Sequence, residues 1–180
     1  MQIVSERLRL RPFELADAPV FSAYRSDPDV ARYQSWNTPY TLSDARAFVG
    51  EMRTVDERQP GWYQWAIERL DEPGLIGDVG VNLLDDRIQA MLGYTLAPHF
   101  QRQGYAREAI GRMLDHLFVE RGLRRVGAEC DPRNEASVRL LERLGFWREG
   151  HLRASTWSKG EWTDDVVYRL LAEEWRAGRG

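Results

Sequence analysis

The stretch APHFQRQGYAREAIGRML at residues 97–114 joins a polar, loop-like half to a half with apolar residues at helical spacing. Gly104 stands at the junction, three residues after Gln101 and two before Ala106. The first N–H groups of a helix lack partners within the helix, and the helix dipole places partial positive charge beside them. Glycine has no Cβ, so an anion can reach these groups. The stretch predicts a phosphate site at a helix N-terminus; the alternative is that Gly104 ends a loop and Arg102 is a solvated charge.

The spacing of this glycine disfavours two common phosphate loops. A P-loop needs a second glycine followed by Lys-Ser/Thr, and a dinucleotide-binding loop reads G-x-G-x-x-G after a parallel strand. Here residues 61–96 instead predict three antiparallel strands, with turns at 71–74 and 85–86. Nucleoside triphosphate hydrolysis and dinucleotide redox chemistry are therefore disfavoured.

The remaining hydrophobic pattern predicts one mixed α/β domain over residues 1–180. A helix with a cap near Asp17 is expected, and a second helix near Ser43 is expected to lack a full capping box, because Arg46 stands three residues later. No internal repeat or linker interrupts the chain. The other predicted elements are a strand at 3–13, a helix at 104–121, a strand at 123–132, a helix opened by Asn134, and a strand pair at 146–155 and 163–171.

The composition indicates a globular protein that is mildly acidic. Of the 180 residues 43% are apolar, and the formal net charge is -3, which argues against a dedicated nucleic-acid binder. Cys130 is the only cysteine, so an intrachain disulfide is excluded and a cysteine metal site is disfavoured. The three histidines show no metal-ligand spacing. The N-terminus has no signal-peptide pattern, and no window reaches the roughly 18 apolar residues of a membrane span. We therefore expect a cytoplasmic protein with no metal, membrane or nucleic-acid partner.

Two long runs closely resemble the signatures of the GNAT acyltransferase superfamily. They are LGYTLAPHFQRQGYAREAIGRMLDHLF at residues 92–118 and AECDPRNEASVRLLERLGFWREGHLR at residues 128–153. With SERLRLRPF at residues 5–13, they resemble the branch that contains the RimJ and RimL ribosomal-protein N-terminal acetyltransferases. The resemblance implies a central, mostly antiparallel sheet that is splayed at its fourth and fifth strands and flanked by helices. It also implies acetyl-CoA as co-substrate and direct transfer of the acetyl group to an amine.

The resemblance also implies which residues hold the coenzyme. Exposed main-chain groups at the splay would hold the pantetheine arm and the acetyl carbonyl, and Asn134 would bond to the same arm. Asn134 also suits a helix N-cap, which is the alternative explanation for it. The pyrophosphate would lie on backbone amides of the loop. The implied cofactor residues are Tyr94, Thr95, Leu96, Gln101, Arg102, Gln103, Gly104, Tyr105, Ala106 and Asn134.

Glu129 and Ser137 are the implied catalytic residues. Some family members carry a glutamate at the place of Glu129 as base; alternatively, Glu129 faces solvent or pairs with an arginine. Ser137 stands where a serine is proposed as acid in the RimL-like branch, although it also suits a first-turn residue that bonds to its own backbone. The tyrosine that many family members use as acid falls at Leu141, so that role is absent. A second glutamate of the branch falls at Thr156, which leaves the base assignment open.

The acceptor is expected to enter opposite the coenzyme, over loops that carry Tyr33, Trp36 and Trp157. Each aromatic is equally suited to the core or to a homodimer interface. Asp164 and Asp165 either attract a cationic acceptor or start a strand. The leading interpretation is acetylation of a protein or peptide N-terminus or a related small amine. The alternatives are a non-catalytic acyl-CoA sensor and an antibiotic-modifying acetyltransferase of the aminoglycoside type.

Overall fold

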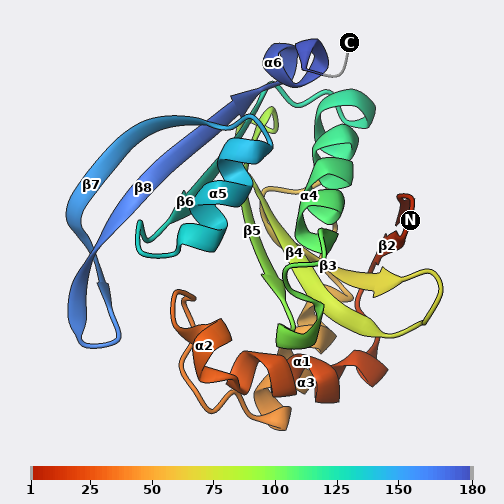
Figure 1. Cartoon of the computed structure of the whole chain (residues 1–180). Coiled ribbons are helices and arrows are strands. Elements are labelled where there is room, and N and C mark those ends of the chain that lie inside the picture. The colour runs from red at the N-terminus through yellow and green to blue at the C-terminus, as the bar shows by residue number, and fades with distance from the viewer. Residues whose placement is uncertain (1, 179–180) are drawn as a thin grey trace.

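The structure, a computed structural model, describes residues 2–178. Eight strands form one sheet in the order β1-β2-β3-β4-β5-β6-β8-β7 (Figure 1). Neighbouring strands pair antiparallel, except that β5 and β6 are parallel. The predicted mixed α/β class with a mostly antiparallel sheet is confirmed. The strands are β1 (Ile3–Val4), β2 (Leu8–Arg11), β3 (Gly61–Arg69), β4 (Leu75–Leu83), β5 (Gln89–Leu96), β6 (Arg125–Cys130), β7 (Trp147–Ser158) and β8 (Glu161–Leu171).

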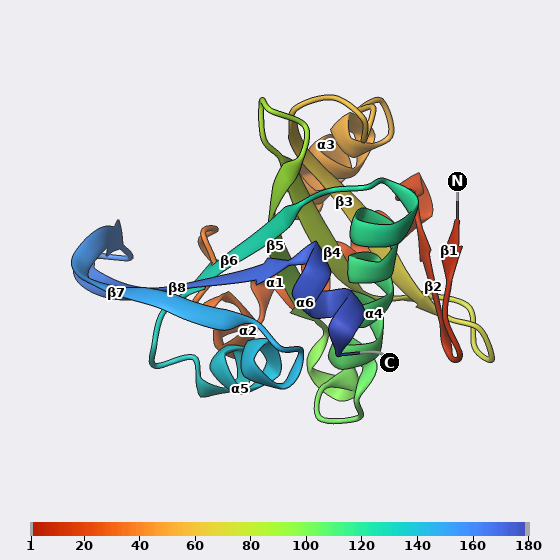
Figure 2. The same ribbon diagram turned by 90° about the horizontal axis from the view of Figure 1, so that it is seen from above.

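Helices cover both faces of the sheet. On one face lie α4 (Tyr105–Asp115), α5 (Glu135–Arg143) and α6 (Ala172–Ala177), as Figure 2 shows. On the opposite face, toward one end of the sheet, a second hydrophobic core is built by α1 (Ala18–Ser26), α2 (Pro28–Ala31) and α3 (Leu42–Met52). The apolar stripe of α4 faces the main core because its members recur three and four residues apart. The stripe residues Ala109, Ile110, Met113 and Leu114 are all fully buried.

Two predicted elements, the first strand and the helix at 104–121, differ from the structure. The strand expected at 3–13 is a hairpin of β1 and β2, in which Ile3 pairs with Leu10. A serine turn makes this hairpin, since the Ser5 hydroxyl accepts a hydrogen bond from the Leu8 N–H at 3.2 Å. The helix expected at 104–121 is α-helical to Asp115 and continues as a π-helical turn over His116–Glu120.

The helix α3 corrects the expectation that it lacks a capping box. Its N-cap is Thr41, two residues before Ser43, and the Thr41 hydroxyl accepts from the Asp44 N–H at 3.1 Å. The Asp44 carboxylate in turn accepts from the Thr41 N–H at 3.1 Å. The box was missed because it was sought two positions too late, from Ser43 rather than from Thr41. The short helices α2 and α6 were also not predicted.

Candidate active site

The sheet opens between β5 and β6. These strands pair in parallel from Gln89 opposite Arg125 to Leu92 opposite Ala128, and then separate. On its other side β5 stays paired with β4 as far as Leu96. Residues 94–96 are therefore paired with β4 but no longer with β6. The predicted splay between the fourth and fifth strands of the sequence pattern, which are β5 and β6 in the structure, is present at the predicted residues.

The register of β5 shows which main-chain groups face this opening. The Ala97 N–H donates to the Ile76 carbonyl at 2.9 Å, which fixes the alternation of the antiparallel ladder. The N–H and C=O groups of Tyr94 and Leu96 therefore point away from β4, into the opening. Side chains already reach both carbonyls: Gln34 Nε2 lies 3.4 Å from the Tyr94 oxygen, and Gln101 Nε2 lies 3.0 Å from the Leu96 oxygen. Thr95 faces β4 instead, so its main chain does not line the opening.

The loop after β5 ends at an N-terminus of α4 that no side chain caps. Gly104 is the N-cap residue, with φ +84°, and makes no side-chain capping hydrogen bond. The first intrahelical bond runs from the Glu108 N–H to the Gly104 carbonyl at 3.1 Å, which leaves the preceding N–H groups without a helical partner. The glycine is needed because a side chain at this φ is strained. Gln101 and the exposed residues 102–104 lead directly into this turn.

The two loop glutamines shape the loop. Gln103 Nε2 donates to the His99 carbonyl at 2.7 Å, just as Gln101 donates to Leu96. Both side-chain amides are therefore engaged within the loop. Tyr105 is buried and Ala106 is half-buried. After Arg102, the polar groups that this turn offers to a ligand are therefore mainly main-chain groups.

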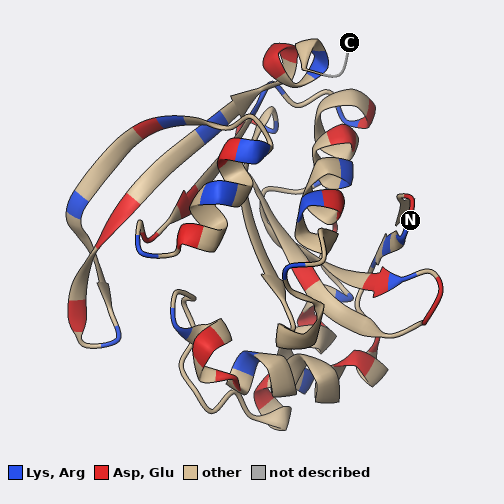
Figure 3. Ribbon diagram, viewed as in Figure 1, with Lys and Arg blue, Asp and Glu red and all other residues tan. Residues whose placement is uncertain are grey.

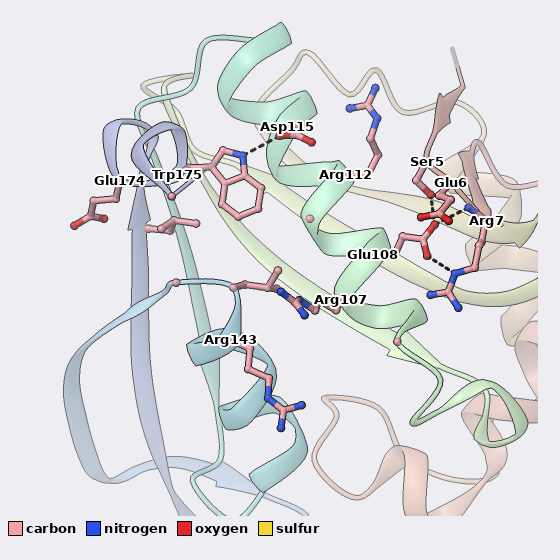
Figure 4. Close-up of a pocket in the computed structure, with 16 residues that line it drawn as sticks. Ser5, Glu6, Arg7, Arg107, Glu108, Arg112, Asp115, Arg143, Glu174 and Trp175 are labelled. Atoms are coloured by element: carbon pink, nitrogen blue, oxygen red, sulfur yellow. Dashed lines mark hydrogen bonds and ion pairs between the residues drawn. The ribbon is translucent and has the colours of Figure 1, made fainter. Parts of the chain in front are cut away.

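Arg7 is a basic residue at this turn that the sequence did not single out. Its Nη1 lies 3.2 Å from the Gln103 carbonyl, and its guanidinium lies 4.6 Å from the ring centroid of Tyr105. Glu108 places a negative charge in the first turn of α4, but its carboxylate is paired with Arg7 and Ser5 of the N-terminal hairpin. The Arg7 N–H and Nε donate to its carboxylate at 2.7 and 2.6 Å, and the Ser5 hydroxyl donates at 2.7 Å (Figure 4). Although burial opposes the shift, these donors lower the pKa of Glu108.

A groove of about 760 Å³ leads from Gly104 along α4 to the C-terminal end of α5 and to α6. Arg107 of α4 and Arg143 of α5 line it, and both are drawn in Figure 4. Figure 3 shows acidic and basic residues interspersed on both helices, with no face of a single sign. The two arginines were also missed, because single arginines on exposed helix faces carry no distinctive sequence signal.

Asn134, Ser137 and Tyr94 meet on the α5 side of the opening. Asn134 Oδ1 accepts from the Ser137 N–H at 3.2 Å, so the alternative reading of Asn134 as a helix cap is present in the structure. Ser137 Oγ lies 2.6 Å from Tyr94 Oη. Cys130 is part-buried nearby, and burial raises the pKa of its thiol, although Ser137 opposes the rise in part. A thiol held neutral in this way is a poor nucleophile.

Glu129 lies at the other side of the same opening. It is one residue beyond Ala128, the last residue of β6 that pairs with β5, and it is opposite Val167 of β8. Ala128 belongs to the core under α4 and α5, so strand alternation directs Glu129 to the opposite face. Glu129 is exposed, and among residues 2–178 no hydrogen bond or ion pair engages its carboxylate. It therefore does not pair with an arginine here.

The acceptor-side aromatics occupy three different settings. Trp36 belongs to the second core: its Nε1 donates to the Arg25 carbonyl at 2.9 Å, and the Arg25 guanidinium stacks 4.0 Å from its ring. Tyr33 is half-buried beside Arg32. Trp157 is 60% exposed near the tip of the β7–β8 hairpin, where it contacts Trp162 at 5.5 Å. The structure therefore does not gather these three side chains into one pocket.

Asp164 and Asp165 stabilise a bulge of the hairpin. The register of β7 and β8 shifts between Leu152 and Thr156. Asp164 accepts from the Ala154 N–H at 2.8 Å and contacts His151 Nε2 at 2.7 Å. Asp165 accepts from hydroxyls on the bulge at 2.6 and 2.7 Å. Both carboxylates are thus used within the hairpin, and they lie inside β8 rather than at its start.

The sheet, its opening and the uncapped helix define an acetyltransferase of the GNAT class, and comparison with known proteins agrees. The family model for the acetyltransferase (GNAT) domain matches residues 7–147, so the chain belongs to this family. The predicted resemblance is confirmed. GNAT acetyltransferases use acetyl-CoA and act on amine acceptors. Within residues 2–178, no cluster of potential metal ligands is found, and no helix is long and apolar enough to span a membrane.

Two relatives cover nearly the whole chain, and a third covers about half of it. The protein described as "uncharacterized N-acetyltransferase p20" of Bacillus licheniformis is 35% identical over 96% of this chain and 97% of its own length. The crystal structure of a GNAT-family acetyltransferase from Bacillus anthracis matches with a TM-score of 0.88 and 30% identity, over 97% of this chain and 100% of that one. The [ribosomal protein uS5]-alanine N-acetyltransferase of Escherichia coli is 32% identical over 88 residues, which is 49% of this chain and 45% of that protein. The chain is an N-acetyltransferase.

Proposed function

We propose that this chain is a single-domain, cytoplasmic enzyme that moves the acetyl group of acetyl-CoA directly to the N-terminal amine of a protein or peptide. The observation that carries the proposal is the strand β5, which leaves β6 after Leu92 and leads, through the loop 97–104, into the uncapped N-terminus of α4. A pantetheine arm has amides that can pair with an exposed strand, and a diphosphate satisfies unpaired N–H groups. One continuous segment thus offers both kinds of contact.

The residues that would hold the coenzyme are therefore mainly main-chain groups. The N–H and C=O groups of Tyr94 and Leu96 face the arm, and the amides of residues 102–106 face the diphosphate. Arg7 adds positive charge beside Gly104. Arg107 and Arg143 border the groove that continues from this turn, so they are placed to meet the remaining phosphate of the coenzyme. Asn134 keeps the first turn of α5 in place against the opening.

The acetyl thioester supplies an activated carbonyl carbon. This chain's residues orient that carbon and handle the protons. N–H groups that face the opening stabilise negative charge on the carbonyl oxygen during attack. Glu129 lies on the face opposite α4 and α5, where it removes a proton from the incoming amine directly or through water. Ser137 lies on the α5 face, which is the side of the sulfur. Glu129, the proposed base, and Ser137, next to the expected sulfur, thus lie on opposite faces of the sheet.

The partial match to the uS5-alanine N-acetyltransferase favours a protein N-terminus as acceptor. Trp157 and Tyr33 remain the residues that we propose for contact with the acceptor, whereas the stacking of half-buried Trp36 with Arg25 indicates support of the core. The homodimer stays a prediction that sedimentation would measure. A mass-spectrometric screen with acetyl-CoA and a panel of peptides, polyamines and aminoglycosides tests the proposal. Acetylated peptide N-termini support it; product formed only from polyamines or aminoglycosides contradicts it.

A further inference from the structure

Tyr94 stands where the pairing of β5 with β6 has just ended. Its side chain lies on the face covered by α4 and α5 and packs against the main core. From there its hydroxyl reaches Ser137 in the first turn of α5, at 2.6 Å. This hydrogen bond spans the gap between the two walls of the opening, so both hydroxyls lie where the sulfur side of the thioester is expected.

The environment of Tyr94 determines what its hydroxyl does. Burial raises the pKa of Tyr94, and the hydrogen bond with Ser137 opposes the rise only in part. The phenol therefore keeps its proton at neutral pH, and it acts as a donor and not as a base. Either hydroxyl can donate in the 2.6 Å contact; in one of the two arrangements, Ser137 donates to Oη. The proton of Tyr94 is then free to point toward another acceptor.

Leu141 has no hydroxyl, and Tyr94 supplies one close to the same place. The family resemblance places an acid tyrosine at this residue, which is a leucine with only 1% of its surface exposed. Leu141 follows Ser137 by four residues, so both lie on the same face of α5. A phenol that enters from β5 and contacts Ser137 supplies a hydroxyl next to the face where a tyrosine at 141 would have supplied one.

We propose that Tyr94 is the residue that donates a proton to the leaving thiol, and that Ser137 is its positioning residue. The inference rests on the proposed function, because it requires a thioester in this opening. The amine nitrogen bonds to the acetyl carbon, the carbon–sulfur bond breaks, its electron pair stays on sulfur, and sulfur takes the proton of Tyr94. The amine's proton goes to Glu129 or to water. As this proton leaves, Ser137 passes its own proton to Oη and is reprotonated by solvent, so that no buried phenolate is left.

The test compares the binding of coenzyme A with that of desulfo-coenzyme A, which lacks the sulfur. Titration calorimetry is run with a reductant at a series of pH values from about 7 to 10, because the pantetheine thiol is less acidic than a cysteine thiol, whose usual pKa is about 8.5, and only the upper values populate the thiolate. A hydrogen bond from a phenol to a charged sulfur should make the wild type prefer coenzyme A by about tenfold. In Tyr94→Phe this ratio should fall to about one, while affinity for desulfo-coenzyme A stays as in the wild type. Turnover of this variant should fall by about 100-fold.

Three further variants separate catalysis from packing. Tyr63→Phe removes another buried hydroxyl, on β3, and should keep the full preference for coenzyme A. Ser137→Ala should lower the preference, and Ser137→Thr should restore it. Equal loss of both ligands in Tyr94→Phe, or an unchanged ratio, would overturn the inference. Failure of the proposed coenzyme site looks different, because the wild type would then bind neither ligand; failure of the proposed peptide acceptor would leave both affinities unchanged.

Discussion

Replacing Gly104 with valine tests the phosphate site at its narrowest point. Gly104 has φ +84°, and a Cβ built on it lies 3.3 Å from Nη2 of Arg7. A side chain in this left-handed region costs about 1–2 kcal/mol, which for a chain of this size lowers Tm by roughly 2–8 °C. Arg7 is exposed and flexible enough to move, so the fold should survive.

The loss in coenzyme affinity should be larger than the loss in stability. A hydrogen bond between a backbone N–H and a charged phosphate contributes about 1.5–3 kcal/mol, so losing one such bond weakens binding roughly 10- to 150-fold. Gly122→Val is the matched control, because Gly122 has φ +73° and nothing within 4 Å of its built Cβ. It lies after the π-helical turn, remote from the loop.

The assay pairs titration calorimetry of coenzyme A with thermal unfolding of both variants. We expect similar falls in Tm for the two, but weaker coenzyme binding only for Gly104→Val. If both variants bind coenzyme A like the wild type, the diphosphate does not lie on this turn and the reasoning is refuted.

Three other substitutions probe the base, the opening and the N-terminal hairpin. Glu129→Gln should lower turnover about 100-fold with acetyl-CoA affinity unchanged, and wild-type turnover in stopped-flow thiol release would remove Glu129 from the mechanism. Gly77→Ala should cost about 1–3 kcal/mol in urea denaturation, because its Cβ would lie 2.3 Å from the Thr95 carbonyl oxygen; an unchanged midpoint would mean that β4 and β5 separate without cost. Glu108→Gln should cost about 1 kcal/mol at neutral pH through the lost contacts with Arg7. The pKa of Glu108 is lowered in the folded state, so its stabilisation holds above the unfolded pKa of about 4.3 and is lost as pH falls through the lower folded pKa; a difference between the two denaturation curves that does not shrink as the pH falls below about 4 would contradict this origin.

The sequence was most informative where a structural demand leaves few residue choices. A helix N-terminus open to an anion needs Gly104, and the buried stripe of α4 needs apolar residues at helical spacing. Both predictions match the geometry, and so does the end of β5–β6 pairing near Tyr94. The turn of the N-terminal hairpin could not be seen, because Ser5 makes it through a local hydrogen bond inside an otherwise alternating pattern.

Side-chain roles were harder to predict because they depend on contacts between distant segments. The sequence identified Tyr94 only for its main chain, and the proximity of its hydroxyl to Ser137, 43 residues later, follows from the sheet order. Arg7 reaches the loop from the far end of the chain. The loop position of Trp36 suggested contact with the acceptor, but its stacking on Arg25 is a tertiary contact that no local pattern reveals.

The most direct measurement is a crystal structure of the chain with coenzyme A bound. We predict the diphosphate within about 2.7–3.2 Å of main-chain nitrogens among residues 102–106, with the sulfur in the opening between β5 and β6. A diphosphate bound elsewhere on the surface, away from the main-chain nitrogens of residues 102–106, would contradict the account.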